Sequence, residues 1–300
     1  MAATVGDSAN ILHGTTKVEV LVYDPANIGV PLQAFTDIGY SEENVTLTTD
    51  TTVEDVLVAE EVDPVDQLIT ARQATIAIAF KEFTIDNVFL AMSEATHTLG
   101  TGSLSMGRKN ATPTLTRLGM RLSGVNEAGF DRVIFAGHAI PVGNAEQAFS
   151  IRAKTLVAGE FRAVRPSINQ SVVKNFEFTA DLTSWVVGAA GWAQNAADGG
   201  VARTSAADTL TQTLLNFVNG VPYVVRFDVS TFTSGDVTPT LGSVAGTAVT
   251  ANAAKIEQII TPTEAGGADL VFTSSTTPVL DIDKVYVFPA DVLSYFDKTA

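Results

Sequence analysis

The sequence predicts a mainly β protein made of two units. Thr, Val, Ala and Gly are abundant, runs of alternating side chains recur, and patterns long enough for extended helices are missing. Hydrophobic residues make up 46% of the 300 residues, which argues against intrinsic disorder. Because a domain typically has roughly 150 residues, we expect a chain of this length to form two domains.

The segment 53–95 carries the clearest structural pattern. Large side chains at Ile76, Ile78 and Phe80 alternate with alanines, a two-residue period that predicts a strand over 68–84 with one large and one small face. We expect the large face to pack inward. The small face would then point away from the core.

A short helix is predicted directly after this strand. Thr84 is a suitable N-cap residue, and Ile85, Val88, Phe89 and Met92 follow at the i, i+3, i+4, i+7 spacing of one helix face. The helix therefore has one apolar side to bury.

The rest of the N-terminal unit (1–168) is predicted as an arm over 1–14 followed by strands. We place a turn at Thr51-Thr52, so that a return strand follows it, and a loop at 60–66. The expected strands are 17–24, 45–49, 56–58, 114–122, 131–137, 145–152 and 155–164.

A change in composition near 166–172 predicts a linker to a second unit at 169–290. Charges thin out there, and short, evenly spaced runs suggest a two-sheet sandwich or jelly roll. Residues 291–300 read as a tail or one helical turn. The expected strands are 176–179, 185–188, 201–204, 208–217, 221–230, 237–241, 247–251, 255–261, 268–273 and 282–288.

Charge and cysteine content exclude several classes of site. The formal net charge is −15 and is spread over both units, so tight binding of nucleic acid is not expected. The chain has no cysteine, which rules out disulfides and thiolate metal sites. The N-terminal residues lack the basic and apolar regions of a signal peptide, and no run of 18 apolar residues predicts a membrane span.

No catalytic constellation emerges from the sequence. The histidines His13, His97 and His138 are not at ligand spacing, and the glycine-rich run at 100–107 fits neither a dinucleotide-binding nor a P-loop pattern. A nucleophile elbow is also missing. We therefore expect a protein that is not an enzyme and needs no cofactor.

Six acidic residues surround the predicted loop at 60–66. Their spacing does not match an EF-hand, which needs oxygens at alternate positions, a glycine and a terminal glutamate. A solvated or interfacial loop is the favoured reading. The residues are Glu54, Asp55, Glu60, Glu61, Asp63 and Asp66.

The segment 53–95 resembles the tail tube (major tail) proteins of long-tailed bacteriophages. The resemblance lies in a strand pair, a long loop with Asp63-Pro64-Val65-Asp66, a strand carrying Glu82, and a helix at 84–92. The later run 131–164 also resembles the strands that close the tube subunit. Together these patterns cover roughly residues 15 to 165.

This resemblance implies a structural virion protein that assembles in the host bacterial cytoplasm. Copies would form hexameric rings that stack into a tube for DNA, with the acidic residues around the loop as the ring-stacking element. Other tail proteins, namely tape measure, terminator and baseplate, would be its partners, and no membrane would be involved. The strand residues Ala77, Ala79 and Lys81 would face a neighbouring subunit or the lumen.

The second unit is similar to carbohydrate-binding-module-like jelly rolls. The similarity lies in the tryptophans Trp185 and Trp192, the strand around Tyr223, and the ending Ile282-Asp283-x-Val285. It implies that the three aromatic side chains could stack on a host-surface glycan, or else belong to the core. Asp283 would be a calcium ligand if the unit holds that ion.

These observations leave open which class of protein the chain belongs to. A tail tube subunit with an outward decoration domain is the first hypothesis. A secreted carbohydrate-binding or accessory protein and a capsid decoration protein are the alternatives. If the second unit is only a decoration, deleting residues 175–300 should leave assembly intact.

Overall fold

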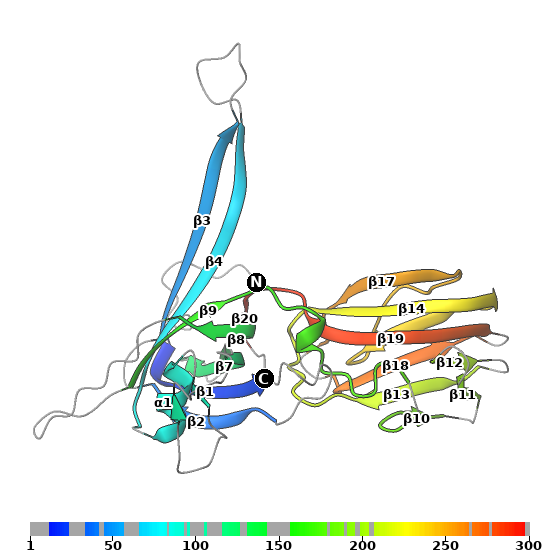
Figure 1. The fold of residues 1–300 in the computed structure, drawn as a ribbon, viewed down its shortest axis with the longest axis horizontal. Coiled ribbons are helices and arrows are strands. Elements are labelled where there is room, and N and C mark those ends of the chain that lie inside the picture. The colour runs from blue at the N-terminus through cyan, green and yellow to red at the C-terminus, as the bar shows by residue number, and fades with distance from the viewer. Residues whose placement is uncertain are drawn as a thin grey trace, which may run out of the picture.

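The fold is mainly β and is built from antiparallel sheets with one α-helix in the described part of the chain (Figure 1). This confirms the predicted fold class. The computed structural model describes residues 12–23, 34–41, 45–56, 66–82, 84–92, 95–96, 105–106, 116–126, 131–142, 157–178, 181–188, 191–195, 199–203, 207–263, 266–275 and 278–297.

The N-terminal unit is an eight-stranded sheet in the order β2-β1-β7-β8-β9-β4-β3, with β20 also paired to β8. A small separate pair, β5 and β6, lies between the helix and β7 in the chain. The strands are β1 (Leu12–Tyr23), β2 (Thr36–Tyr40), β3 (Thr46–Val56), β4 (Asp66–Phe80), β5 (Ala95–Thr96), β6 (Ser105–Met106), β7 (Arg117–Asn126), β8 (Asp131–Pro141), β9 (Val157–Ala163) and β20 (Ser294–Asp297).

The eight-stranded sheet curls around its own core without closing into a barrel. Its two ends approach each other where Ser41, just after β2, forms a bridge to Phe80 of β4. The helix α1 (Ile85–Ala91) lies over the core, and its buried side packs with β4 and β9. The predicted N-cap is confirmed, because the Thr84 hydroxyl accepts a hydrogen bond from the Asn87 amide at 3.1 Å.

Several predicted boundaries in this unit are wrong. Thr51 and Thr52 do not form a turn but lie inside β3, opposite Arg72 and Ala71. The strand β3 therefore runs on to residue 56, and β4 begins at residue 66. The expected arm at 1–14 overlaps β1, which begins at Leu12, and the expected strand at 145–152 lies outside the described residues.

The second unit is a sandwich of two five-stranded antiparallel sheets, ordered β10-β13-β18-β15-β16 and β11-β12-β19-β14-β17. Side chains from both sheets form one apolar core. Most expected strands are confirmed, but the described residues 176–178 form a turn, and 247–251 form no strand, since Val249 makes only an isolated bridge to Val237. The strands are β10 (Val186–Val187), β11 (Trp192–Asn195), β12 (Gly200–Arg203), β13 (Thr209–Thr213), β14 (Tyr223–Ser234), β15 (Val237–Leu241), β16 (Val244–Ala245), β17 (Ala253–Ile260), β18 (Asp269–Ser274) and β19 (Val279–Pro289).

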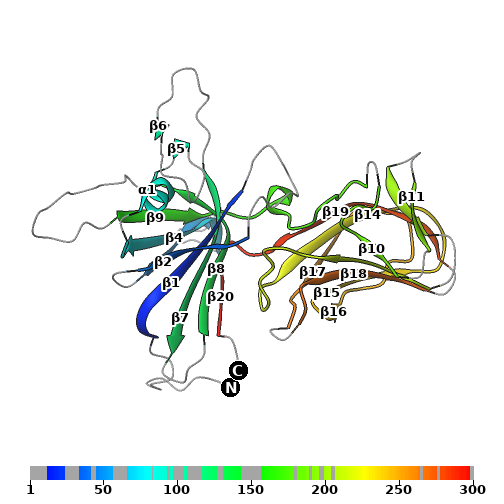
Figure 2. The ribbon, with the colours of Figure 1, turned by 90° about the horizontal axis from the view of Figure 1, so that it is seen from below.

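The segment expected to be a linker is packed. Ser167 caps the 3₁₀-helix η2 (Ile168–Gln170) through a capping box with Gln170, and Val172 and Val173 are buried in the sandwich core. The expected tail also differs, because 294–297 form β20 and pair with β8. The sandwich is therefore inserted between β9 and β20, and Figure 2 shows it beside the curled sheet.

The two connections between the units meet at Gly137 of β8. A Cβ atom on this glycine would lie 2.5 Å from Cγ of Pro289 and 3.3 Å from Cγ of Pro166. The Tyr23 hydroxyl donates a hydrogen bond to the Gly137 carbonyl oxygen at 2.9 Å. Glycine is required here because two rigid proline rings occupy the space of a side chain.

We expect Gly137→Ala to lower the free energy of unfolding by about 1 to 3 kcal/mol, since the new methyl group must displace the Pro289 ring. Equilibrium unfolding in urea measures the loss. Gly267→Ala is the matched control, because its Cβ would lie 3.8 Å from the nearest atom, Oδ2 of Asp269, and should cause no loss. Equal stability of Gly137→Ala and wild type would contradict the tight packing at this point.

Candidate functional site

A long β-hairpin extends from the curled sheet, and we call residues 50–56 of β3 and 66–73 of β4 the hairpin arm. The strands pair from Asp50 with Gln73 to Val56 with Asp66. Strand β9 pairs with β4 only from Ala74 to Phe80, so it stops where the arm begins. In Figure 1 the upper part of β3 and β4 rises away from every other labelled element.

Both edges of the hairpin arm are open among the described strands. The outer edge of β3 has no neighbour along its length, and β4 has none between 66 and 73. Three apolar side chains of the arm are exposed: Leu68 at 60%, Val53 at 49% and Ile69 at 46%. Open edges with exposed apolar side chains favour pairing with another chain, and a two-stranded ribbon alone is only marginally stable.

The contact predicted for this region rests on its acidic residues, whereas the structure also exposes the apolar side chains of Val53, Leu68 and Ile69. Glu54 is exposed and lies opposite Leu68, while Asp55 and Asp66 lie in the paired strands. Glu60, Glu61 and Asp63 are outside the described residues. The alternation in 46–56 could have revealed the arm, had the pattern not been divided at Thr51-Thr52.

Side chains alternate strictly where β4 and β9 pair. Ile76, Ile78 and Phe80 are buried against α1 as predicted, with Phe80 in edge-to-face contact with Phe161. The opposite side, which we call the uncovered face, points away from the core. It consists of Thr46, Thr48, Asp50, Gln73, Thr75, Ala77, Ala79, Ala158, Glu160 and Arg162.

The uncovered face carries small or uncharged polar side chains at most positions. Ala77 is exposed and Ala79 half-buried, and Lys81 is exposed just after the strand. Glu160 and Arg162 are two residues apart on β9 and have opposite formal charges. Such a surface offers neither a deep apolar pocket nor a cluster of cations to hold a ligand.

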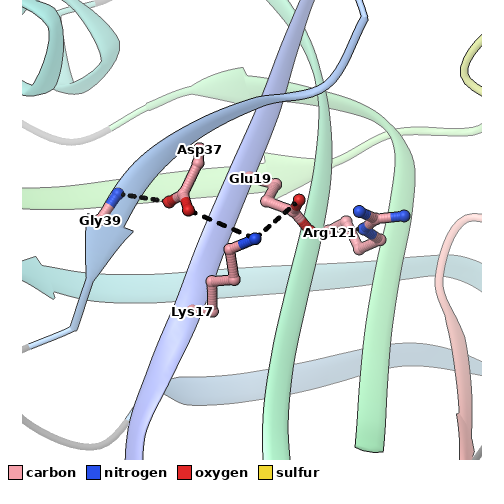
Figure 3. A network of polar contacts seen from close by, with 5 residues as sticks. All are labelled: Lys17, Glu19, Asp37, Gly39 and Arg121. Carbon is pink, nitrogen blue, oxygen red and sulfur yellow. Dashed lines mark hydrogen bonds and ion pairs between the residues drawn. The ribbon is translucent and has the colours of Figure 1, made fainter.

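On the other side of the curl, the outer face of β1 and β7 carries a network of charges (Figure 3). The Lys17 ammonium lies 3.1 Å from Glu19 and 3.3 Å from Asp37, and Arg121 Nε donates to Glu19 at 2.6 Å. The Arg121 guanidinium also lies over the ring of Phe35, 5.3 Å from its centroid. This network covers the sheet beside the sandwich.

Two opposing effects set the pKa of Glu19. Burial raises it, but the hydrogen bond and charge of Arg121, joined by those of Lys17, outweigh burial and hold the pKa below its ordinary value of 4.5. The ionised form is therefore favoured by folding. Glu19 contributes stability that is fully present above pH 4.5 and is lost as the pH falls through the lower pKa of the folded state.

We expect Glu19→Gln to destabilise the protein at pH 7, and the difference from wild type to shrink as the pH falls below 4.5. The physical reason is that a protonated Glu19 resembles glutamine in charge. Urea midpoints measured from pH 7 to pH 3 test this, with Glu160→Gln on the exposed side of β9 as control. A difference that stays constant over this range would exclude the ion pairs as its cause.

The three aromatic residues proposed to stack on sugars belong to the sandwich core. Trp185 is 7% exposed, Trp192 3% and Tyr223 fully buried. Trp185 Nε1 donates to the Asn175 carbonyl oxygen at 3.2 Å, and the Tyr223 hydroxyl accepts from the Val218 amide at 2.9 Å. The sugar-stacking prediction is therefore wrong for these side chains, because neighbouring strands enclose their rings.

Asp283 is also not placed as a calcium ligand. Its carboxylate lies 3.9 Å from the Lys284 ammonium, which also approaches Asp228 at 3.5 Å on the neighbouring strand. Burial raises the pKa of Asp283, and the negative charges of Asp228 and Glu177 add to that effect. Among the described residues, no group of three or more histidines and carboxylates could hold a metal ion.

Comparison of the sequence with models of known protein families finds no match, and comparison with curated proteins finds no similar sequence. Within the described residues, no helix is long and apolar enough to cross a membrane. The hairpin arm and the uncovered face are thus the features of this structure from which a function can be argued.

Proposed function

We propose that the chain is a structural, non-enzymatic subunit that assembles with copies of itself into stacked rings, forming the tail tube of a long-tailed bacteriophage. The rings are hexameric by resemblance to that family. Nucleic acid passes through the central channel without specific binding. The observation that carries this proposal is the hairpin arm, which has two open strand edges and three exposed apolar side chains.

The arm supports self-assembly because, in an isolated molecule, its apolar side chains and strand edges are exposed to water. Among the described strands, neither β3 at 53–56 nor β4 at 66–73 has a neighbour on its outer edge, and a strand of another chain can pair there with little distortion. The exposed side chains of Val53, Leu68 and Ile69 gain from the same contact. A second copy of the chain is the partner that a repeating assembly supplies.

The uncovered face supports the role of a channel wall. A wall must not bind what passes along it, and polyanionic DNA binds to clustered cations through release of its counterions. Among the described residues of this face the strands carry one cation, Arg162, with Glu160 two residues before it on β9, and Lys81 is a second exposed cation just after β4. The overall charge of −15 adds long-range repulsion.

The sandwich supports a place away from the channel. It packs on the outer side of β8, where Phe135 joins the sandwich core, and leaves the side chains of the uncovered face exposed. Burial of Trp185, Trp192 and Tyr223 removes the observation that favoured a carbohydrate-binding protein. A weak glycan contact through other side chains is the alternative, and the glycan array described below tests for it.

We expect the double variant Leu68→Thr, Ile69→Thr to lose assembly while keeping its fold, because threonine preserves the strand but removes most of the apolar contact. Burying one such side chain contributes about 1.5 kcal/mol, so each substitution should weaken association roughly tenfold. Sedimentation velocity and negative-stain electron microscopy measure assembly, and far-ultraviolet circular dichroism checks the fold.

The matched control is Ile259→Thr on β17 of the sandwich, which removes a side chain that is 70% exposed but distant in sequence from the arm. It should assemble like the wild type. Tubes of normal length from the double variant would exclude the arm as the assembly element. A wild-type chain that stays monomeric at every concentration and binds glycans on an array would overturn the tube proposal itself.

A further inference from the structure

The sandwich separates two strands that belong to the same sheet. β9 ends at Ala163, the sandwich follows, and β20 then returns to the N-terminal sheet at 294–297. β9 pairs with β8 only at 139–141, whereas β20 pairs with β8 at 132–135. The two strands therefore pair with the same edge of β8. The first part of that edge, 132–135, is paired by β20, which is synthesised after the whole sandwich.

The outer side of β8 is covered by the sandwich. Phe135 lies in the same apolar cluster as Val172, Val218 and Tyr223 of the second unit. The ring of Phe35 meets Phe135 edge-on, with centroids 6.2 Å apart. One hydrophobic core thus continues across the boundary between the two units, which is unlike a domain attached through a flexible linker.

The seat of β20 is formed by both units. On one side its backbone pairs with β8, from Ser294 opposite Phe135 to Asp297 opposite Arg132. On the other side the Phe296 ring lies against Gly220, 3.0 Å from where a Cβ would be. Gly220 has φ +86°, so this sandwich loop adopts a conformation that presents bare backbone to the ring.

We propose that the sandwich is a folding checkpoint for the N-terminal sheet. β20 takes its place only when the loop at Gly220 and the strand leading to Pro289 are formed, that is, when the sandwich is folded. Until then the edge of β8 at 132–135 stays open and Phe135 uncovered. Domains of a nascent chain fold as units from the N-terminus, so this edge is closed last.

The checkpoint changes what a deletion would do. Removing residues 175–300 takes away β20 together with the sandwich, so the expectation that this deletion leaves assembly intact no longer follows. The checkpoint concerns one chain alone and does not rest on the proposed tube. Its test therefore uses the full-length protein and needs no assembly.

Native-state hydrogen exchange of the full chain tests the checkpoint with Leu280→Ala. Leu280 is buried in the sandwich core on β19, about 30 Å from Pro289 at the rise of a strand, so the change does not touch β8 directly. We expect the amides of 132–135 to exchange at least about tenfold faster, in step with the sandwich amides. Acceleration that also reaches 76–80 of β4 supports the same coupling.

A second variant removes the contact between Phe296 and Gly220 that links β20 to the sandwich. Phe296→Ala should open 132–135 while amides in the sandwich interior keep their wild-type rates, and Leu280→Val replaces Leu280→Ala if the latter does not fold. Ile259→Ala, at an exposed position, should change neither region. Unchanged protection at 132–135 in Leu280→Ala, while the sandwich amides exchange at least tenfold faster, would overturn the proposal and show two independent units.

Discussion

The burial of one face of the β4–β9 pair beneath α1 is the constraint on which the rest of the N-terminal unit depends. Ile76, Ile78 and Phe80 enter the core from β4, and Phe161 meets Phe80 from β9. Because a strand alternates its side chains, this burial directs the small and polar residues outward together. The uncovered face is therefore a consequence of the core and not a separate feature.

The same strand anchors the hairpin arm. β4 has fifteen residues, of which those from Ala74 onward pair with β9 and those before it pair only with β3. Packing of the second half against the helix holds the first half in a fixed direction away from the sheet. A two-stranded ribbon that would be only marginally stable by itself is in this way anchored at its base to a packed core.

The aromatic residues of the sandwich stabilise its core, whereas the sequence suggested that they could bind a sugar. Its tryptophans fill the space between two sheets, and its connections cross at Gly137 under two proline rings. Through Phe135 and Phe296 it shares packing with the sheet of the other unit. A chain that passes out to the sandwich and back ties the stability of both units together, which a simple C-terminal attachment would not do.

The sequence alone determined the local features of this protein. The mainly β class, the buried side of β4, the helix with its cap at Thr84 and most strands of the sandwich follow from periodicity and capping, which act over a few residues. The tertiary structure decided the length of the hairpin arm, the burial of Trp185 and Trp192, and the pairing of β20 with β8. These depend on which distant strands become neighbours, and an alternating pattern is the same whether a strand edge is paired or open.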